Sequence, residues 1–475
     1  MVPPPSQKEK GKKNLESAEW YHGFRPKKDA CRLVCEPGEF LVRATDTGPK
    51  TDIVITACDD NRKKVNLVLT YDGMNWHIKQ TNSTNPIKTK FPTIVELVEH
   101  YRTHPPSKHL RLSKAILRPE WMLKHENVIY EEKDKLGQGN FCSVYKGLWK
   151  RGGDVNPVAV KISQKAMNAT DAESEDAKEA RIAMMHEAHI MSFFAHEHVV
   201  SFFGVACDHQ PVLVVMEFCA GGDLLTHLIK QGRKTEDLEK LVYLFEGSRG
   251  MLYLHSKKCV HRDLAARNCL ISSTGRIKIA DFGLSKLIDD VEPEGETNSS
   301  NAHVPVRWMA PETLRKPPVY SQRSDVWAFG VMAYEIFNNG VKPWPDEPVK
   351  YVATQIRKGN MPKLPESTPC KVVDLVSRMW NTQADKRPRM HAIAKELCSI
   401  IKEITTTQGA MKHDNLTINQ IMGVARDAFF EFDDSSEFES SHSTCDSDYV
   451  DVKGEKNPGV FIRKKPREPK VEKEK

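Results

Sequence analysis

The chain has 475 residues, enough for two to four domains at roughly 100–200 residues each. Hydrophobic residues make up 39% and charged residues 28%, which excludes a wholly disordered, collagen-like or disulfide-dominated protein. The 70 Lys and Arg residues against 64 Asp and Glu residues give a net charge of +6. Spread over this length, that charge is weak and does not indicate nucleic-acid binding.

The cysteines and the hydropathy pattern indicate the compartment. The 11 cysteines are scattered and form no CxxC pair, so neither a disulfide framework nor a zinc module is predicted. No run of about 18 uncharged apolar residues occurs, and the first residues contain no apolar signal region. These features predict a protein of a reducing compartment, the cytoplasm.

The amino-terminal part predicts a small α+β domain. Residues 1–16 are rich in Pro, Lys and Glu and predict a disordered arm. Within residues 17–114, three alternating apolar segments predict strands, and the apolar spacing of Thr93–Tyr101 predicts a helix. A central sheet flanked by helices is therefore expected there. Residues 115–127 are expected to form a short linker.

The remainder predicts a second, larger domain and a tail. Residues 128–402 begin with strand-like segments separated by glycine turns, and a helical pattern at 171–195 precedes a mainly helical part. This order predicts a β-rich lobe followed by a helical lobe. Residues 403–475 are first rich in Ser, Asp and Glu and then in Lys and Pro, which predicts a disordered tail. The predicted fold class is α+β and multidomain.

Five motifs follow one another in the second domain. They are the glycine-rich LGQGNFCSV from Leu136, VAVK ending at Lys161, HRDLAARN over His261–Asn268, DFG from Asp281, and APE at 310–312. A single motif of this kind is weak evidence, because a tight turn needs glycines for its own sake. In this order they resemble the protein kinases, with their bilobal fold. The resemblance implies phosphoryl transfer from ATP with Mg²⁺ as cofactor.

The resemblance assigns a role to each catalytic residue. Asp263 would accept the proton of the substrate hydroxyl, and Lys161 would hold the ATP phosphates. Glu187 is expected to hold Lys161 in turn, with Glu179 as the alternative because the segment before this helix is long. Hard oxygen ligands suit magnesium. The expected metal ligands are Asn268 and Asp281.

The implied ATP site combines the glycine-rich loop, an apolar sandwich around adenine and a hinge. Backbone N–H groups of the loop would cover the phosphates. Cys142 stands where the family usually has its third glycine, and its Cβ is expected to restrict the loop. The expected ATP-binding residues are Leu136, Gly137, Gln138, Gly139, Asn140, Phe141, Cys142, Ser143, Val144, Ala159, Lys161, Met216, Glu217, Cys219 and Leu270.

Two segments resemble tyrosine kinases in particular. Ala265–Arg267 lacks the Lys that Ser/Thr kinases usually carry after the catalytic Asp, and Pro305–Trp308 resembles a platform for a longer substrate side chain. The resemblance implies that Arg267 contacts the protein substrate. Residues 284–307 contain no tyrosine, although this family usually switches on by phosphorylation there. We therefore expect activity without tyrosine phosphorylation of this segment. The alternative is an adaptor with an inactive kinase fold.

The first domain resembles an SH2 domain. WYHG at 20–23, FLVR at 40–43 and FPTIVELVEHY at 91–101 occur in the family's order. Arg43 ends an apolar strand, and a bidentate guanidinium there suits the dianion of phosphotyrosine better than an internal salt bridge. The resemblance implies the same function for Lys27 and Thr45. It places Trp76 at the family's strand histidine, with His77 adjacent.

An SH2 domain directly ahead of a tyrosine kinase resembles the Fes/Fer group of non-receptor kinases, without their F-BAR region. The short linker implies that SH2 docks on the small lobe and that bound phosphopeptide raises kinase activity. Expected partners are tyrosine-containing substrates and phosphotyrosine proteins. Lysines at 8–13 and 464–475 are more simply solvated tails than contacts with anionic lipid at the plasma membrane. Tyr449, among acidic residues, is an autophosphorylation candidate.

Overall fold

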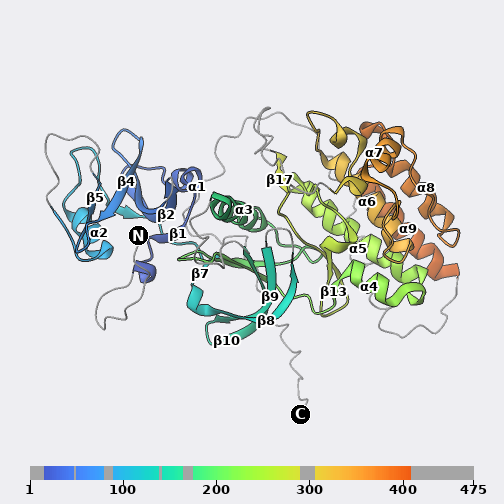
Figure 1. Ribbon diagram of the computed structural model, residues 1–475, viewed down its shortest axis with the longest axis horizontal. Coiled ribbons are helices and arrows are strands. Elements are labelled where there is room, and N and C mark those ends of the chain that lie inside the picture. The colour runs from blue at the N-terminus through green and yellow to red at the C-terminus, as the bar shows by residue number, and fades with distance from the viewer. Residues whose placement is uncertain are drawn as a thin grey trace, which may run out of the picture. The chain divides into compact units, whose positions relative to one another are not determined.

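The structure is a computed structural model (Figure 1). It describes residues 15–47, 50–79, 89–138, 142–163, 175–288 and 305–407. The chain forms two compact units. The first comprises residues 1–192 and 202–218, and the second comprises residues 193–201 and 219–475. Within the described part, no helix is both long and apolar enough to cross a membrane.

The first sheet forms the predicted amino-terminal domain. Its strand order is β1-β2-β3-β4-β5, with β6 beside β2, and the β2–β3, β3–β4 and β4–β5 pairs are antiparallel. Successive side chains of a strand point to opposite faces. Leu41 of β2 therefore packs against α1, whereas Phe40 and Val42 pack against α2 on the other face. The elements are β1 (Tyr21–Phe24), α1 (Lys27–Leu33), β2 (Glu39–Thr47), β3 (Lys50–Cys58), β4 (Lys64–Tyr71), β5 (Trp76–Ile78), α2 (Ile94–Thr103) and β6 (Lys114–Ala115).

The second sheet completes the first unit, with strand order β7-β11-β12-β10-β9-β8. The second half of its central strand β10 is mostly buried, and Val158, Val160 and Ile162 there belong to the hydrophobic core. The segment expected as a linker contributes β7, which pairs in parallel with β11. The elements are β7 (Met122–Leu123), β8 (Val128–Gln138), β9 (Cys142–Arg151), β10 (Asp154–Ser163), α3 (Glu175–Met191), β11 (Phe202–Ala206) and β12 (Leu213–Glu217).

The second unit is mainly helical, as expected. Helix α6 is buried along nearly its whole length, and an apolar helix surrounded by protein is typical of a domain centre. A capping box at Ser321 starts this helix. Helix α9 continues to Thr407, past residue 402 where the domain is predicted to end. The helices are α4 (Leu224–Gln231), α5 (Asp237–Ser256), α6 (Gln322–Phe337), α7 (Val349–Lys358), α8 (Cys370–Met379) and α9 (Met390–Thr407).

Short strands and 3₁₀ turns carry the motif residues of the second unit. Strands β13, β15 and β16 form one small sheet, and β14 pairs with β17. The strands are β13 (Gly222–Asp223), β14 (Cys259–Val260), β15 (Cys269–Ile271), β16 (Ile277–Ile279) and β17 (Lys286–Leu287). The turns used below are η5 (Ala266–Asn268) and η7 (Val306–Trp308).

Candidate functional site

Lys161 and Glu187 form an ion pair in the first unit. Lys161 lies on β10 opposite Val144 of β9 and Val214 of β12, so its position is set by two strand registers. Its Nζ lies 2.7 and 2.8 Å from the two carboxylate oxygens of Glu187 on α3. The side chains are 13% and 5% exposed, and such burial strengthens the attraction between the charges. Glu179, the alternative partner, is exposed on the same helix.

The other predicted nucleotide-binding residues of the first unit lie along the same strands. Ala159 is buried and faces Met216 across the β10–β12 pair, where Glu217 is the next residue of β12. Cys142 is half-buried at the start of β9, opposite Ser163 of β10. Leu136, Gly137 and Gln138 end β8 and are exposed, and Ser143 and Val144 follow on β9. Gly139, Asn140 and Phe141 lie outside the described residues. Cys219 and Leu270 belong to the second unit.

The HRDLAARN segment, which is the predicted catalytic loop, lies in the second unit. Asp325 near the start of α6 accepts hydrogen bonds from the backbone N–H groups of His261 and Arg262, at 2.9 and 3.0 Å. Arg262 has a φ of 69°, a conformation that costs a non-glycine residue free energy. Those two hydrogen bonds help to hold this backbone. The function of Asp325 as an anchor becomes visible only in the fold.

Asp263 is held by two neighbours on the next turn. Its Oδ2 accepts a hydrogen bond of 2.9 Å from the Asn268 side-chain amide, and its Oδ1 forms an ion pair with Arg267. Burial raises the pKa of Asp263, and the positive charge of Arg267 opposes that shift. The carboxylate is therefore oriented and partly desolvated, as a general base requires.

Asn268 and Asp281 fit the requirements of a magnesium site. The Asn268 amide donates both of its hydrogen bonds to Asp263 through Nδ2. Its amide oxygen is of the type that ligates magnesium. The backbone carbonyl of Asn268 accepts a 2.9 Å hydrogen bond from Ala280, which precedes Asp281. Asp281 is exposed and has a φ of 61°. Among the described residues, no group of three or more His, Cys, Asp and Glu side chains gathers as a metal site.

Arg267 connects the catalytic loop to the segment before APE. Its guanidinium lies 4.4 Å from the ring centroid of Trp308 on η7, within cation–π distance. Trp308 donates a 3.0 Å hydrogen bond through Nε1 to Glu335 of α6. Sequence reasoning named Arg267 and Pro305–Trp308 but missed Glu335, because a single Glu inside an apolar helix carries no motif.

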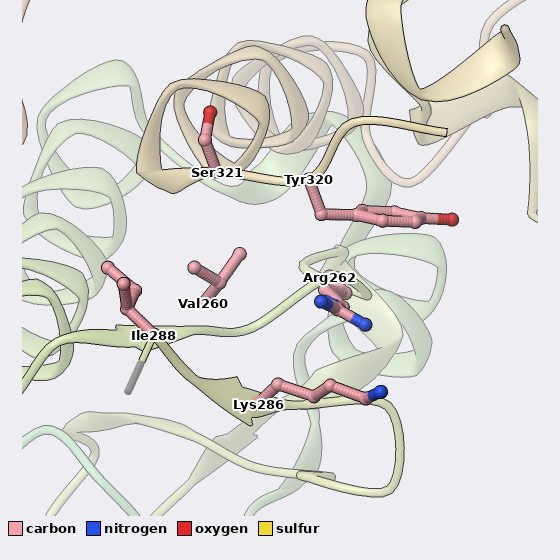
Figure 2. A pocket seen from close by; sticks show the side chains of 6 residues that line it. All are labelled: Val260, Arg262, Lys286, Ile288, Tyr320 and Ser321. Carbon is pink, nitrogen blue, oxygen red and sulfur yellow. The ribbon is translucent and has the colours of Figure 1, made fainter. Parts of the chain in front are cut away.

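A basic cavity lies beside the catalytic loop. Its volume is about 370 Å³, and Figure 2 shows Arg262 between the Tyr320 ring and Lys286, with Val260 and Ile288 farther along the cavity. The Arg262 guanidinium lies 4.6 Å from the Tyr320 centroid. Burial lowers the pKa of Arg262. The lining side chains thus include two cations and no carboxylate, which favours an anion. Residues 289–304 lie outside the described part.

Arg43 is the buried cation of the first sheet. Its side chain is 1% exposed, and burial lowers its pKa to about 10. It donates hydrogen bonds to Thr56 Oγ1 at 2.9 Å, to Asn66 Oδ1 at 3.1 Å and to the Arg25 carbonyl at 2.9 Å. All three acceptors are uncharged, so these contacts position the guanidinium without neutralising it. This arrangement favours an anionic ligand.

The other predicted phosphotyrosine residues are less closely tied to Arg43. Thr45 is buried on the same face of β2, two residues along, and Lys27 is exposed at the start of α1. Trp76 and His77 lie on β5, whereas Arg43 contacts Asn66 of the neighbouring strand β4. Sequence reasoning missed Thr56 and Asn66, because single polar residues in strands give no signal without the pairing register.

The first sheet contacts the second sheet within the first unit. The Phe24 backbone N–H donates to the Cys207 carbonyl at 2.6 Å, and Tyr21 donates through its hydroxyl to the Asp208 carbonyl at 3.1 Å. Arg181 of α3, 1% exposed, forms a 2.8 Å ion pair with Asp46 at the end of β2. The helix that carries Glu187 therefore contacts the strand that carries Arg43.

Comparisons with known proteins agree with this geometry. Residues 130–397 match the family model of protein tyrosine and serine/threonine kinases, and residues 20–101 match the SH2 domain model. The chain is 33% identical over 397 residues to Fer-related kinase 1 of Caenorhabditis elegans, which covers 81% of this chain and 94% of that protein.

Two further relatives are longer than the matched region. The chain is 33% identical over 404 residues to tyrosine-protein kinase Fer of Mus musculus, covering 83% of this chain and 45% of the mouse protein. It is 32% identical over 389 residues to the tyrosine-protein kinase transforming protein Fps of avian sarcoma virus, covering 81% and 68% respectively. The chain thus spans nearly all of the worm relative and less than half of the mouse relative.

Proposed function

This chain belongs to the Fer- and Fps-related protein-tyrosine kinases with an SH2 domain, and from this premise we propose how it transfers the γ-phosphate of ATP to protein tyrosine. The observation that carries the proposal is the catalytic loop. There, Asp263 is oriented by Asn268 and by Arg267, and Arg267 also contacts the Trp308 ring. Phosphoryl transfer depends mainly on such positioning and on charge neutralisation.

In this mechanism Asp263 accepts the proton of the tyrosine hydroxyl. The hydroxyl oxygen forms the new bond to the γ-phosphorus while the bond to the β-phosphate oxygen breaks. The raised pKa of Asp263 makes its carboxylate a better base. Lys161, held by Glu187, neutralises the α- and β-phosphates. The oxygens of Asn268 and Asp281 would hold Mg²⁺, which would supply further neutralisation of the phosphate charge.

The test is phosphate transfer from ATP and Mg²⁺ to a Glu/Tyr copolymer by the purified chain. Asp263→Asn and Lys161→Met serve as controls that lack the base and the phosphate ligand. Incorporation into tyrosine that both substitutions abolish is the expected result. Nucleotide binding without transfer by the parent chain would contradict the proposal and favour the phosphotyrosine-binding adaptor.

We also propose that the SH2 domain binds phosphotyrosine through Arg43 and thereby raises kinase activity. Support comes from the buried ion pair of Asp46 with Arg181, since α3 also carries Glu187. A phosphotyrosine ligand that orders the end of β2 at Asp46 would stabilise α3 through Arg181. Helix α3 would then stay in the position that pairs Glu187 with Lys161.

This second proposal is tested by turnover with and without a phosphotyrosine peptide. We expect the peptide to raise turnover of the parent chain. The same peptide without its phosphate should have no effect, and Arg181→Gln should reduce the response. Equal turnover with and without the phosphopeptide, at a concentration that saturates binding, would contradict activation while leaving the kinase reaction untouched.

The partners are proposed from the two domain types. Protein substrates with tyrosine follow from the kinase domain, and phosphotyrosine proteins follow from the SH2 domain. We propose a cytoplasmic location. The lysines at 8–13 and 464–475, which lie outside the described residues, are expected to be solvated, with peripheral contact to anionic membranes as the alternative. Co-sedimentation with vesicles that contain phosphatidylserine, compared with neutral vesicles, tests this contact.

A further inference from the structure

Glu335 is a buried carboxyl group that connects two parts of the second unit. It lies on α6 and is 1% exposed. Its Oε2 accepts a 2.9 Å hydrogen bond from the Ala266 backbone N–H of η5 and a 3.0 Å hydrogen bond from Trp308 Nε1 of η7. One oxygen atom thus joins the catalytic-loop turn and the segment before APE to the central helix.

One donor belongs to the turn that contacts the proposed base, and the other contacts Arg267 of that turn. Turn η5 carries Arg267 and Asn268, both of which hold the Asp263 carboxylate. The Arg267 guanidinium also lies 4.4 Å from the Trp308 ring. These contacts link the residues into a ring. Glu335 contacts Trp308, Trp308 contacts Arg267, and Arg267 lies on the same turn as Ala266, which contacts Glu335 again. A shift of the Trp308 ring would move the surface on which Arg267 rests.

The chemistry of Glu335 suits a fixed acceptor. Burial raises the pKa of Glu335, while the two hydrogen bonds and the positive charge of Arg267 oppose the shift. Its second oxygen, Oε1, has no hydrogen-bond partner among the described residues. Such an incompletely paired carboxyl is unfavourable for folding alone, since a buried polar atom without a partner costs free energy. Polar groups retained at that cost often serve function.

We propose that Glu335 is a positioning residue of the kinase reaction, whose Oε2 sets the Trp308 ring relative to the catalytic loop and so places Arg267 and Asp263 for the tyrosine of a protein substrate. This inference rests on the proposed phosphoryl transfer and assigns to Glu335 no contact with ATP. Substitution of Glu335 should therefore change the kinetic constants for the protein substrate and leave those for ATP unchanged.

The experiment is steady-state kinetics of the full chain, with a tyrosine peptide and ATP varied in turn. Glu335→Leu removes the acceptor at similar volume, and we expect kcat/KM for the peptide to fall about 10- to 100-fold, with KM for ATP unchanged. Glu335→Gln keeps an oxygen that accepts both hydrogen bonds, so it should lose clearly less than Glu335→Leu.

Trp308→Phe provides a second route that leaves α6 intact. It removes the indole N–H but keeps a ring beneath Arg267, and we expect a fall of about threefold to tenfold in kcat/KM for the peptide. The matched control is Trp380→Phe, because Trp380 Nε1 has no hydrogen-bond partner in the described structure of the same unit. That control should match the parent chain. The double substitution Trp308→Phe with Glu335→Leu should be no worse than Glu335→Leu alone.

The outcomes separate this inference from the proposed function. Unchanged peptide kinetics in both Glu335→Leu and Trp308→Phe would overturn the positioning role while the parent chain remained an active kinase. An equal rise in KM for ATP, or additive losses in the double variant, would also overturn it. If the thermal midpoint shows that Glu335→Leu does not fold, the peptide kinetics of Trp308→Phe alone test the positioning role. A parent chain without transfer would instead reject the proposed function.

Discussion

Glu187 and Glu179 lie on the same helix but differ in burial, and that difference separates their expected roles. Glu187 is 4% exposed and contacts Lys161, whereas Glu179 is exposed. A motif search cannot measure burial, so the sequence left both residues as candidates. The structure shows which carboxylate faces Lys161, and the role of this pair toward ATP stays a prediction.

Glu187→Gln is predicted to lower kcat/KM for ATP by roughly 10- to 100-fold. Loss of one partner of a buried ion pair leaves the other charge uncompensated, so Lys161 would no longer be held for the phosphates. Glu179→Gln on the same helix is the matched control and should match the parent chain. Kinetics at varied ATP concentration check this, and similar losses in both variants would argue against the assignment.

Arg43→Lys is predicted to weaken phosphotyrosine-peptide binding by about 10- to 100-fold, because Lys keeps the charge but lacks the planar fork. Three uncharged acceptors orient the Arg43 guanidinium, and Lys cannot satisfy all of them in the same geometry. Arg32→Lys, on the exposed surface of α1, is the control. Fluorescence anisotropy with a labelled phosphopeptide measures the affinity, and unchanged binding by Arg43→Lys would place the ligand elsewhere.

At the scale of elements, the turn between β11 and β12 packs closely against β1. Gly23 of β1 has a φ of 60°, and a Cβ there would lie 2.3 Å from the Cys207 carbonyl oxygen. A backbone carbonyl cannot move away as cheaply as a flexible side chain. The glycine of the WYHG motif is thus required in this structure by the neighbouring sheet as well as by its own backbone conformation.

Gly23→Ala is predicted to lower the thermal midpoint and the phosphopeptide response, at a cost on the order of 1–3 kcal/mol for strain and steric overlap. Gly73→Ala is the matched control, since Gly73 also has a positive φ, of 102°, but a Cβ added there would meet no described atom within 4 Å. Differential scanning fluorimetry and stimulated turnover measure both effects. Equal behaviour of the two variants would show that the contact with Cys207 contributes little.

The segment from 284 to 307 is predicted to support activity without phosphotyrosine, because it contains no tyrosine. The cations Arg262 and Lys286 line the neighbouring cavity (Figure 2). Treatment with a tyrosine phosphatase should leave basal turnover within about twofold of the untreated chain. A large loss that returns only with phosphotyrosine formation would refute this expectation.

At the scale of the whole molecule, stability should depend on pH through a buried carboxyl group of the second unit. Glu246 on α5 is 4% exposed, and burial raises its pKa to about 7 from 4.5. Its Oε2 accepts a hydrogen bond from the Ile277 N–H, and Glu197, Arg249 and Arg276 also act on its charge. The folded unit therefore holds a proton that the unfolded chain releases above about pH 4.5.

Because the folded unit binds this proton more tightly than the unfolded chain does, a rise in pH should destabilise the folded unit. As pH rises from about 4.5 to 7, the unfolding free energy should fall by up to about 3 kcal/mol. Glu246→Gln cannot ionise, so its thermal midpoint should exceed that of the parent chain at pH 8, and the gap should shrink toward pH 5. Glu366→Gln, at an exposed position, is the control. A gap that is constant with pH would contradict the prediction.

The sequence by itself determined the domain types, the order of the lobes and the motif residues Lys161, Asp263, Asn268, Asp281 and Arg43. Chemistry on phosphate needs particular residue types at short, fixed spacings, and such spacings are visible along one chain. The alternation of strand residues likewise allowed the first sheet to be predicted, and the apolar spacing of Thr93–Tyr101 allowed its second helix to be predicted.

Only the tertiary structure decided which residues support those motifs. Thr56 and Asn66 reach Arg43 through strand register, Asp46 reaches Arg181 through packing, and Glu335 reaches Trp308 from the central helix. These partners are 13 to 135 positions apart in the chain. Their residue types are ordinary, so nothing local marks them. Burial and register give them their function, because an ordinary carboxylate or amide acts strongly only where water is excluded and its partner is held in place.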